Sequence, residues 1–135
     1  CRLLAVQLQE HGVQIEPSVL RSALSGLVRV AGRGKVLVAR DASKEIIGIA
    51  CLSYVWTLEH GGTCAWLDEL YVVPHRRGAG IGVALLREAI ARVREEGALA
   101  LDLEVDEEHL RAERLYEREG FRRLPRRRWS RRLTA

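Results

Sequence analysis

Apolar residues recur every three or four positions in four segments of this chain, and this period predicts four amphipathic helices. The segments are residues 2–10, 18–31, 80–96 and 106–119. Glycine follows the last two of them, at Gly97 and Gly120, where a helix commonly ends. Three acids at residues 106–108 would stabilise the first turn of the fourth helix through its dipole.

Runs of β-branched and other apolar residues between turn-forming residues predict strands. They cover residues 35–40, 46–58, 64–73 and 98–105, with two short strands at 121–124 and 126–133. The first three strands follow one another through short polar turns, so we expect them to pair antiparallel. The order of elements predicts one α+β domain over residues 1–135, with a mixed, mostly antiparallel sheet flanked by helices.

Composition limits the classes of protein to which the chain could belong. No run of eighteen apolar residues is present, so we expect no membrane span and no membrane partner. No signal-peptide pattern opens the chain, and we therefore expect a cytoplasmic protein. The sequence contains no Met and begins at Cys1, which suggests that an N-terminal segment is missing.

Basic residues are concentrated at the C-terminal end. Residues 121–135 carry seven arginines and no acid, whereas the remaining residues carry 15 basic and 18 acidic side chains. A basic tail suggests a nucleic-acid partner. However, Trp129 is the one tryptophan in this tail, and arginine outnumbers lysine twenty to two throughout the chain. We therefore expect a solvated strand in the segment 122–135 and no nucleic-acid binding.

The three cysteines, Cys1, Cys51 and Cys64, have no spacing typical of a metal site, so we expect no metal. Cys51 and Cys64 would lie on the two arms of a hairpin. In that register Cys51 faces roughly residue 70 and Cys64 roughly residue 57, so the two would not form a disulfide. Buried free thiols in a reducing compartment are the expected state.

A strand runs directly into a glycine-rich turn in the stretch LDELYVVPHRRGAGIG, residues 67–82. Glycines at Gly78, Gly80 and Gly82 would let a ligand approach the main chain at the start of a helix, where unpaired N–H groups favour a phosphate. The Gly-Lys-Ser/Thr of a Walker A loop is absent. The dinucleotide-binding pattern fits poorly, because Val83 stands where a small residue is needed.

Two motifs together resemble those of a known family. Arg77 to Gly82 reads R-G-A-G-I-G, similar to the Q/R-x-x-G-x-G/A pyrophosphate loop of the GNAT superfamily of acetyl-CoA-dependent N-acetyltransferases. Residues 103–121, LEVDEEHLRAERLYEREGF, resemble the second hallmark of that superfamily, a strand followed by N-x-x-A-x-x-L-Y-x-x-x-G-F. His109 stands in place of the usual Asn. The resemblance also implies a first strand before the first helix, which is missing from this sequence.

The resemblance implies acetyl-CoA as co-substrate and assigns residues to it. The loop 76–83 would bind the pyrophosphate through the main chain of Gly78, Ala79, Gly80, Ile81, Gly82 and Val83, assisted by Arg77. The third strand would separate from the fourth, and the pantetheine arm would then pair with the main chain of Leu70, Tyr71 and Val72. His109 and Ala112 would contact the cofactor from the second motif, although His109 could equally be an ordinary surface residue.

Acetyl transfer to an amine needs a base, donors for the oxyanion and an acid for the leaving thiolate. Tyr116 has the place of the family's general acid, and its phenol stays protonated at neutral pH because its ordinary pKa is about 10. Asp68 resembles the carboxylate of polyamine acetyltransferases, with Glu69 as a second candidate base. Adjacent strand residues face opposite ways, so only one of these acids should enter the cleft.

These features predict an N-acetyltransferase, a transferase that moves the acetyl group directly to a primary amine without an acyl-cysteine. The acceptor could be a small amine or a protein amino group, and family habit would allow a homodimer. A non-catalytic acyl-CoA-binding or nucleic-acid-associated domain is the alternative function.

Overall fold

The computed structural model describes residues 1–134, which form two compact units, residues 1–104 and 105–134. The first unit contains three helices and four strands: α1 (Arg2–Glu10), α2 (Pro17–Arg29), β1 (Gly34–Arg40), β2 (Ile46–Thr57), β3 (Gly62–Val72), α3 (Ile81–Glu95) and β4 (Leu101–Leu103). A short 3-10 turn, Pro74–Arg76, lies between β3 and α3. The second unit contains α4 (Leu110–Arg118).

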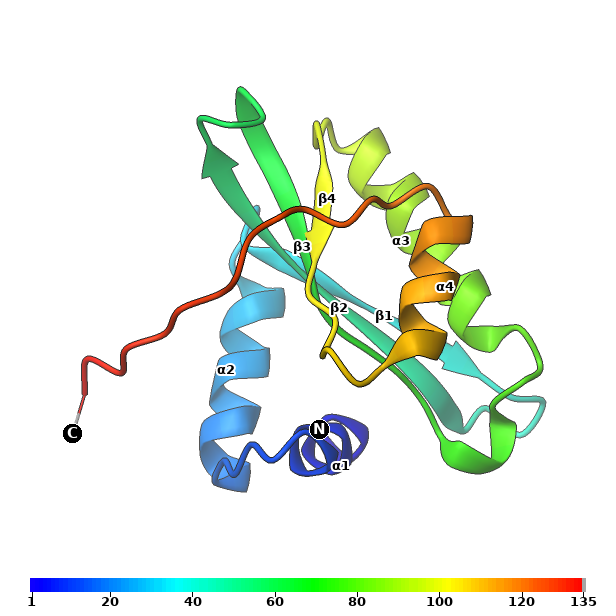
Figure 1. The fold of residues 1–135 in the computed structure, drawn as a ribbon. Helices are drawn as coiled ribbons and strands as arrows, with labels where there is room; N and C mark the ends of the chain where they lie inside the picture. The colour runs from blue at the N-terminus through cyan, green and yellow to red at the C-terminus, as the bar shows by residue number, and fades with distance from the viewer. Residues whose placement is uncertain (135) are drawn as a thin grey trace. The chain divides into compact units, whose positions relative to one another are not determined.

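The four strands form one sheet in the order β1-β2-β3-β4 (Figure 1). β1, β2 and β3 pair antiparallel through two hairpins, whereas β4 reaches β3 by way of α3 and pairs with it parallel. This arrangement confirms the expected mixed, mostly antiparallel sheet of an α+β fold. No helix within residues 1–134 is long and apolar enough to cross a membrane.

The two faces of the sheet are covered by different helices. Ile49, Cys51 and Tyr71 form a buried cluster with Leu4 of α1 and Leu20 of α2. The alternate residues of β2 face the other way, toward α3, because successive side chains of a strand point to opposite faces. The core therefore has two layers, one on each side of the sheet, and Figure 1 shows α1 and α2 on the side opposite α3.

Close packing of α3 on the sheet depends on Gly48 of β2. A Cβ atom at this position would lie 2.9 Å from Cδ1 of Leu85 and 3.3 Å from Cγ2 of Ile81, so only glycine allows α3 to approach this closely. The apolar stripe of α3 meets the sheet as its periodicity predicts, since Leu85, Leu86, Ala89 and Val93 are all buried.

A β-bulge interrupts the pairing of β2 with β3. Cys51 is opposite Glu69, but the next residue of β2, Leu52, is opposite Leu67, so Asp68 is the extra residue. Cys51 was expected to face roughly residue 70, and its actual partner is one residue earlier. Cys64 is opposite Val55 rather than residue 57, because the turn lies at residues 58–61, earlier in the chain than the expected register requires. Both thiols are buried and free, as predicted.

The second half of the chain forms less regular structure than its sequence predicts. β4 has three residues instead of eight, and α4 begins at Leu110 instead of residue 106. The strands predicted at 121–124 and 126–133 are wrong, since residues 121–134 contain no strand. A strand needs a partner for its main chain and an apolar face to bury, and this arginine-rich segment offers few apolar residues. Residue 135, the end of the predicted strand segment 122–135, lies outside the described residues.

Candidate functional site

The glycine-rich turn joins β3 to the first turn of α3. Gly78 and Gly80 both have a φ of 83°, in the left-handed region that favours glycine, and Gly80 is the N-cap of α3. A Cβ atom added at either glycine would meet nothing within 4 Å. The main chain is therefore open to an approaching ligand on this side of the turn.

The amides at the start of α3 lie next to these two glycines in the chain. Ile81, Gly82 and Val83 are the first three residues of the helix, so their N–H groups have no acceptor within it. No side chain caps this helix end, and the first helical bond runs from the Ala84 amide to the Gly80 carbonyl at 3.0 Å. Three free amides and the positive end of the helix dipole suit a phosphate group.

The two arginines of the turn each contact a specific partner. Arg77 donates from Nε to the Val72 carbonyl at 2.8 Å, and its guanidinium lies 5.2 Å from the centre of the Tyr71 ring. Its Nη2 also lies 3.8 Å from a carboxylate oxygen of Glu10. Arg76 forms a 3.7 Å ion pair with Asp41. Arg77 thus fixes the turn against the end of β3, and its predicted contact with a phosphate stays a prediction.

β3 continues beyond the point where β4 leaves it. The two strands pair only at residues 65–67 and 101–103, whereas β3 runs on to Val72, so the sheet opens into a notch. The Val73 amide donates to the Ile47 carbonyl at 2.9 Å, which directs alternate residues of β3 toward β2. The main-chain groups of Leu70 and Val72 therefore face the notch, and those of Tyr71 face β2.

One side chain in the notch was missed by the sequence analysis. Gln7 of α1 is 5% exposed and donates from Nε2 to the Leu70 carbonyl at 3.4 Å. Its Oε1 is buried without a hydrogen-bond partner in the described residues. A buried acceptor of this kind costs about 1–3 kcal/mol, so it is unusual in a structural role. The available signal was a polar residue three positions after Leu4 on the apolar side of a helix.

The two adjacent acids of β3 lie in different surroundings. Asp68 is exposed at the bulge, whereas Glu69 is half-buried and lies opposite Cys51, on the face covered by α1 and α2. Burial first, and then the negative charge of Asp68, raise the pKa of Glu69 from 4.5 to about 7. A carboxylate with this pKa exchanges protons near neutrality, as a general base must.

The surroundings of Cys51, the cysteine on this face, disfavour its thiolate form. Burial raises the pKa of Cys51 to about 12, with smaller effects from the charges of Glu69 and Asp68, so its thiol stays protonated. Cys64 is also fully buried, and burial and the charge of Asp102 raise its pKa to about 11. Neither thiol has the electropositive surroundings that an acyl-cysteine would need.

The second unit contains the remaining predicted residues. Ala112 and Tyr116 lie four residues apart on α4, but His109 is the N-cap and precedes the helix, so it does not share their helical face as expected. Burial raises the pKa of the Tyr116 phenol above its ordinary value of 10. The Tyr116 ring packs edge-on against Phe121, with ring centres 5.7 Å apart. Both aromatic residues belong to the second motif.

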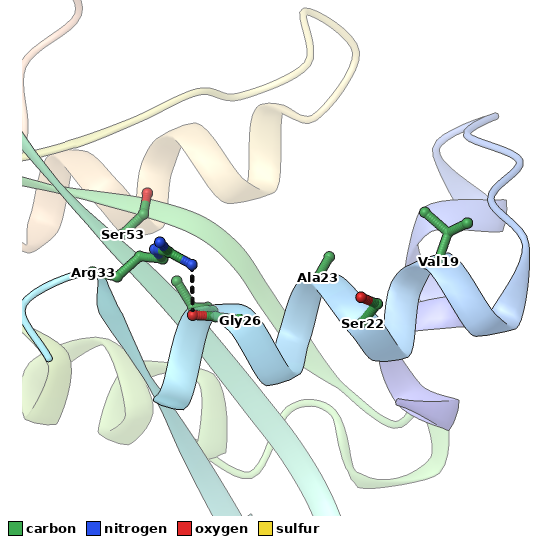
Figure 2. Close-up of a pocket in the computed structure, with 7 residues that line it drawn as sticks. Val19, Ser22, Ala23, Gly26, Arg33 and Ser53 are labelled. Atoms are coloured by element: carbon green, nitrogen blue, oxygen red, sulfur yellow. Dashed lines mark hydrogen bonds between the residues drawn. The ribbon is translucent and has the colours of Figure 1, made fainter. Parts of the chain in front are cut away.

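An open groove of about 730 Å³ lies along α2 (Figure 2). Its lining residues come from α2, the loop after it and β2: Val19, Ser22, Ala23, Gly26, Leu27, Arg33 and Ser53. Arg33 donates to the Gly26 carbonyl at 3.1 Å, as Figure 2 shows. The groove contains no acid and none of the loop residues, so it differs from the site predicted from the sequence.

A comparison with protein-family models identifies the motifs described above. Residues 8–121 match the model of the Acetyltransferase (GNAT) family, which covers the glycine turn, the notch and the second motif. The chain belongs to the GNAT family. Membership confirms the resemblance deduced from Arg77–Gly82 and from residues 103–121.

Two named acetyltransferases are similar to part of this GNAT chain. It is 33% identical over 93 residues to a mycothiol acetyltransferase of Stackebrandtia nassauensis, covering 67% of this chain and 29% of that protein. It is 33% identical over 78 residues to an aminoalkylphosphonate N-acetyltransferase of Salmonella typhimurium, covering 58% of this chain and 51% of that protein. The chain therefore spans between a quarter and about half of the length of these relatives.

A solved structure supports the fold of the GNAT chain directly. A protein from Arthrobacter sp. FB24 is 34% identical and superimposes with a TM-score of 0.80, covering 98% of this chain and 86% of that protein. The α+β fold predicted from the order of helices and strands is thus the fold of the family.

Proposed function

We propose that this GNAT chain transfers the acetyl group of acetyl-CoA directly to a primary amine. The observation that carries the proposal is the start of α3, where three amides without acceptors lie beside the two open positions of Gly78 and Gly80. These residues fit a pyrophosphate, since a side chain at either glycine would occupy the space that the phosphates need.

The notch between β3 and β4 fits the pantetheine arm of the same molecule. Amides of Leu70 and Val72 face the notch and have no strand partner there, so they could pair with an extended chain as a strand would. The carbonyls of these residues already accept bonds from Gln7 and Arg77. We therefore assign the cofactor contacts to the two amides, and leave Tyr71 with a packing role through its buried ring.

Glu69 is the base in this proposal, in preference to Asp68. The carboxylate of Glu69 accepts a proton from the ammonium group of the acceptor, because its raised pKa matches proton exchange near pH 7. The Leu70 amide donates to the thioester oxygen as it gains negative charge, while the Val72 amide pairs with the pantetheine arm. Asp68 acts through its charge, which keeps the pKa of Glu69 high.

Tyr116 is the acid in this proposal, on the basis of its position in the second motif. Its phenol remains protonated at neutral pH, because burial raises its pKa further. It donates its proton to the sulfur of the leaving thiol as the bond from carbon to sulfur breaks. The proton balance closes in two steps: the second proton that the nitrogen loses on becoming an amide returns to the Tyr116 phenolate, and Glu69 releases to solvent the proton that it took from the ammonium group.

The acceptor is proposed to be a small amine. One similar protein is named for an aminoalkylphosphonate and another for mycothiol, both of which are small molecules. The negative charge of exposed Asp68 at the bulge also favours a cationic group.

The test is release of free thiol from acetyl-CoA across a panel of amines, which includes aminoalkylphosphonates, polyamines and a peptide with a free N-terminus. Turnover with at least one small amine, reduced by Glu69→Gln, is the expected result. If the chain binds CoA but releases no thiol with any amine, the catalytic proposal is wrong and a binding domain remains.

A further inference from the structure

Three potential metal ligands lie together at the end of the β2–β3 hairpin, away from the glycine turn. His60 is in the turn after β2, Cys64 is near the start of β3, and Asp102 is the middle residue of β4. Their ligand atoms all lie within 4.8 Å of one another. Asp102 is 38 residues from Cys64 in sequence, so no short spacing motif predicts that the three residues meet.

The strand register explains why these side chains meet. Asp102 pairs with Trp66 in the parallel ladder, and Cys64 lies two residues before Trp66, so both side chains point to the same face of the sheet. The Leu99 amide donates to the Thr63 carbonyl, and the Ala65 amide donates to the Ala100 carbonyl, each at 2.9 Å. These bonds hold the two segments together at the residues before and after Cys64. Positions on rigid strands give a site precise geometry.

The distances fit a tetrahedral metal ion. Cys64 Sγ lies 3.7 Å from Asp102 Oδ2, and His60 Nε2 lies 3.1 Å from the same oxygen. Zinc bonds of about 2.3 Å to sulfur and about 2.1 Å to nitrogen or oxygen, at tetrahedral angles, separate the ligand atoms by roughly 3.4–3.6 Å. The two distances to Asp102 are within a few tenths of an ångström of these values, and the ligand atoms of His60 and Cys64 lie within 4.8 Å of each other.

Burial and charge also favour a cation at this cluster. Cys64 is fully buried, while the side chains of His60 and Asp102 are 24% and 28% exposed, so an ion can enter from solvent. Without an ion, the thiol of Cys64 lies 3.7 Å from the carboxylate of Asp102. Asp102, rather than His60, lies beside the sulfur of Cys64, so the histidine is not placed to activate the thiol as a nucleophile.

We propose that His60, Cys64 and Asp102 bind one zinc ion, with water as the fourth ligand. The thiol releases its proton to solvent when it binds the ion, as cysteine ligands do. The ion joins the hairpin turn to β4 beside the short paired segment of β3 and β4. It thereby fixes the point from which the two strands separate to form the notch. This proposal does not depend on acetyl transfer.

The experiment uses the whole chain with Cys1→Ser, because an exposed N-terminal cysteine could itself bind metal. Metal-free protein is titrated with Co²⁺ and then with Zn²⁺. One equivalent of cobalt should produce a thiolate-to-cobalt charge-transfer absorption, which one equivalent of zinc removes. Zinc at a hundredfold excess over its Kd should raise Tm by roughly 8 °C.

Variants identify the ligands. Cys64→Ala should abolish the charge-transfer absorption, and the matched control Cys51→Ala, which removes the other buried thiol, should retain it. Asp102→Asn keeps the thiol and should raise the Kd for zinc by more than the roughly 10–100-fold that loss of an outer-sphere partner costs. Absence of the absorption in the Cys1→Ser protein, or its persistence in Cys64→Ala, would overturn the proposal.

Discussion

Glu69 offers a prediction that can be measured without knowledge of the acceptor. In the folded chain its pKa is raised from 4.5 to about 7, chiefly by burial. Between pH 4.5 and about pH 7, Glu69 is protonated in the folded state and ionised in the unfolded state. The free energy of unfolding contributed by Glu69 therefore falls as the pH rises from 4.5 to 7, and the full penalty is present above pH 7. Glu69→Gln cannot ionise, so it should remove this penalty.

The magnitude follows from the size of the pKa shift. A rise of 2.5 units corresponds to an upper limit of about 3.4 kcal/mol, at 1.36 kcal/mol for each unit. The Glu69 side chain is only half-buried, so solvent screening reduces this value, and we expect about 1–2 kcal/mol. The variant should thus be more stable than the native chain at pH 8, and equally stable near pH 4, where the native carboxyl group is protonated.

Urea unfolding at pH 4, 6 and 8 measures the difference in free energy of unfolding between Glu69→Gln and the native chain. The matched control is Glu107→Gln, which removes a carboxylate from an exposed position in the first turn after β4 and sets the baseline. Asp68→Asn should reproduce part of the effect, because the charge of Asp68 contributes to the raised pKa. A stability difference for Glu69→Gln that is the same at pH 4 and pH 8 would refute the reasoning.

Three further predictions concern the cofactor, the acid and the notch. Gly80→Asp should weaken CoA binding at least tenfold, as measured by calorimetry, because a carboxylate would lie against the pyrophosphate. The control is Gly97→Asp: Gly97 has a similar positive φ at the other end of α3, and this variant should bind CoA normally. Tyr116→Phe should lower kcat by roughly 10²–10⁴-fold with little change in the Kd for CoA, and an unchanged kcat would remove it from the mechanism. Gln7→Leu should change the free energy of unfolding, measured in urea, by less than about 1 kcal/mol. The substitution removes the unpartnered buried oxygen of Gln7 together with its long hydrogen bond to the Leu70 carbonyl. A loss above about 2 kcal/mol would show that Gln7 is structural.

The sequence predicted the parts of the fold that depend on local pattern. The helical period of α3, the hairpin of β2 and β3, and the glycine turn between strand and helix are all encoded by neighbouring residues. Local pattern could not decide whether the two C-terminal segments, 121–124 and 126–133, form strands. Whether an arginine-rich segment pairs depends on an available sheet edge, and residues 121–134 form no strand.

The candidate base shows how register changes a prediction made from alternation. From the sequence, Asp68 and Glu69 were adjacent acids on opposite faces of a regular strand, and nothing local ranked Glu69 first. The bulge at Asp68 leaves that residue exposed and places Glu69 opposite buried Cys51. Burial depends on which helices cover a face, so the pKa of Glu69 follows from tertiary packing.

The sequence by itself determined the family, the glycine-rich turn and the residues available for chemistry, because these features lie in two short contiguous motifs. Tertiary structure alone decided which amides face the notch, that Gln7 reaches Leu70, and that His60, Cys64 and Asp102 meet. Each of these depends on strand register across long sequence separations, and a shift of one residue would turn every side chain of a strand to the other face.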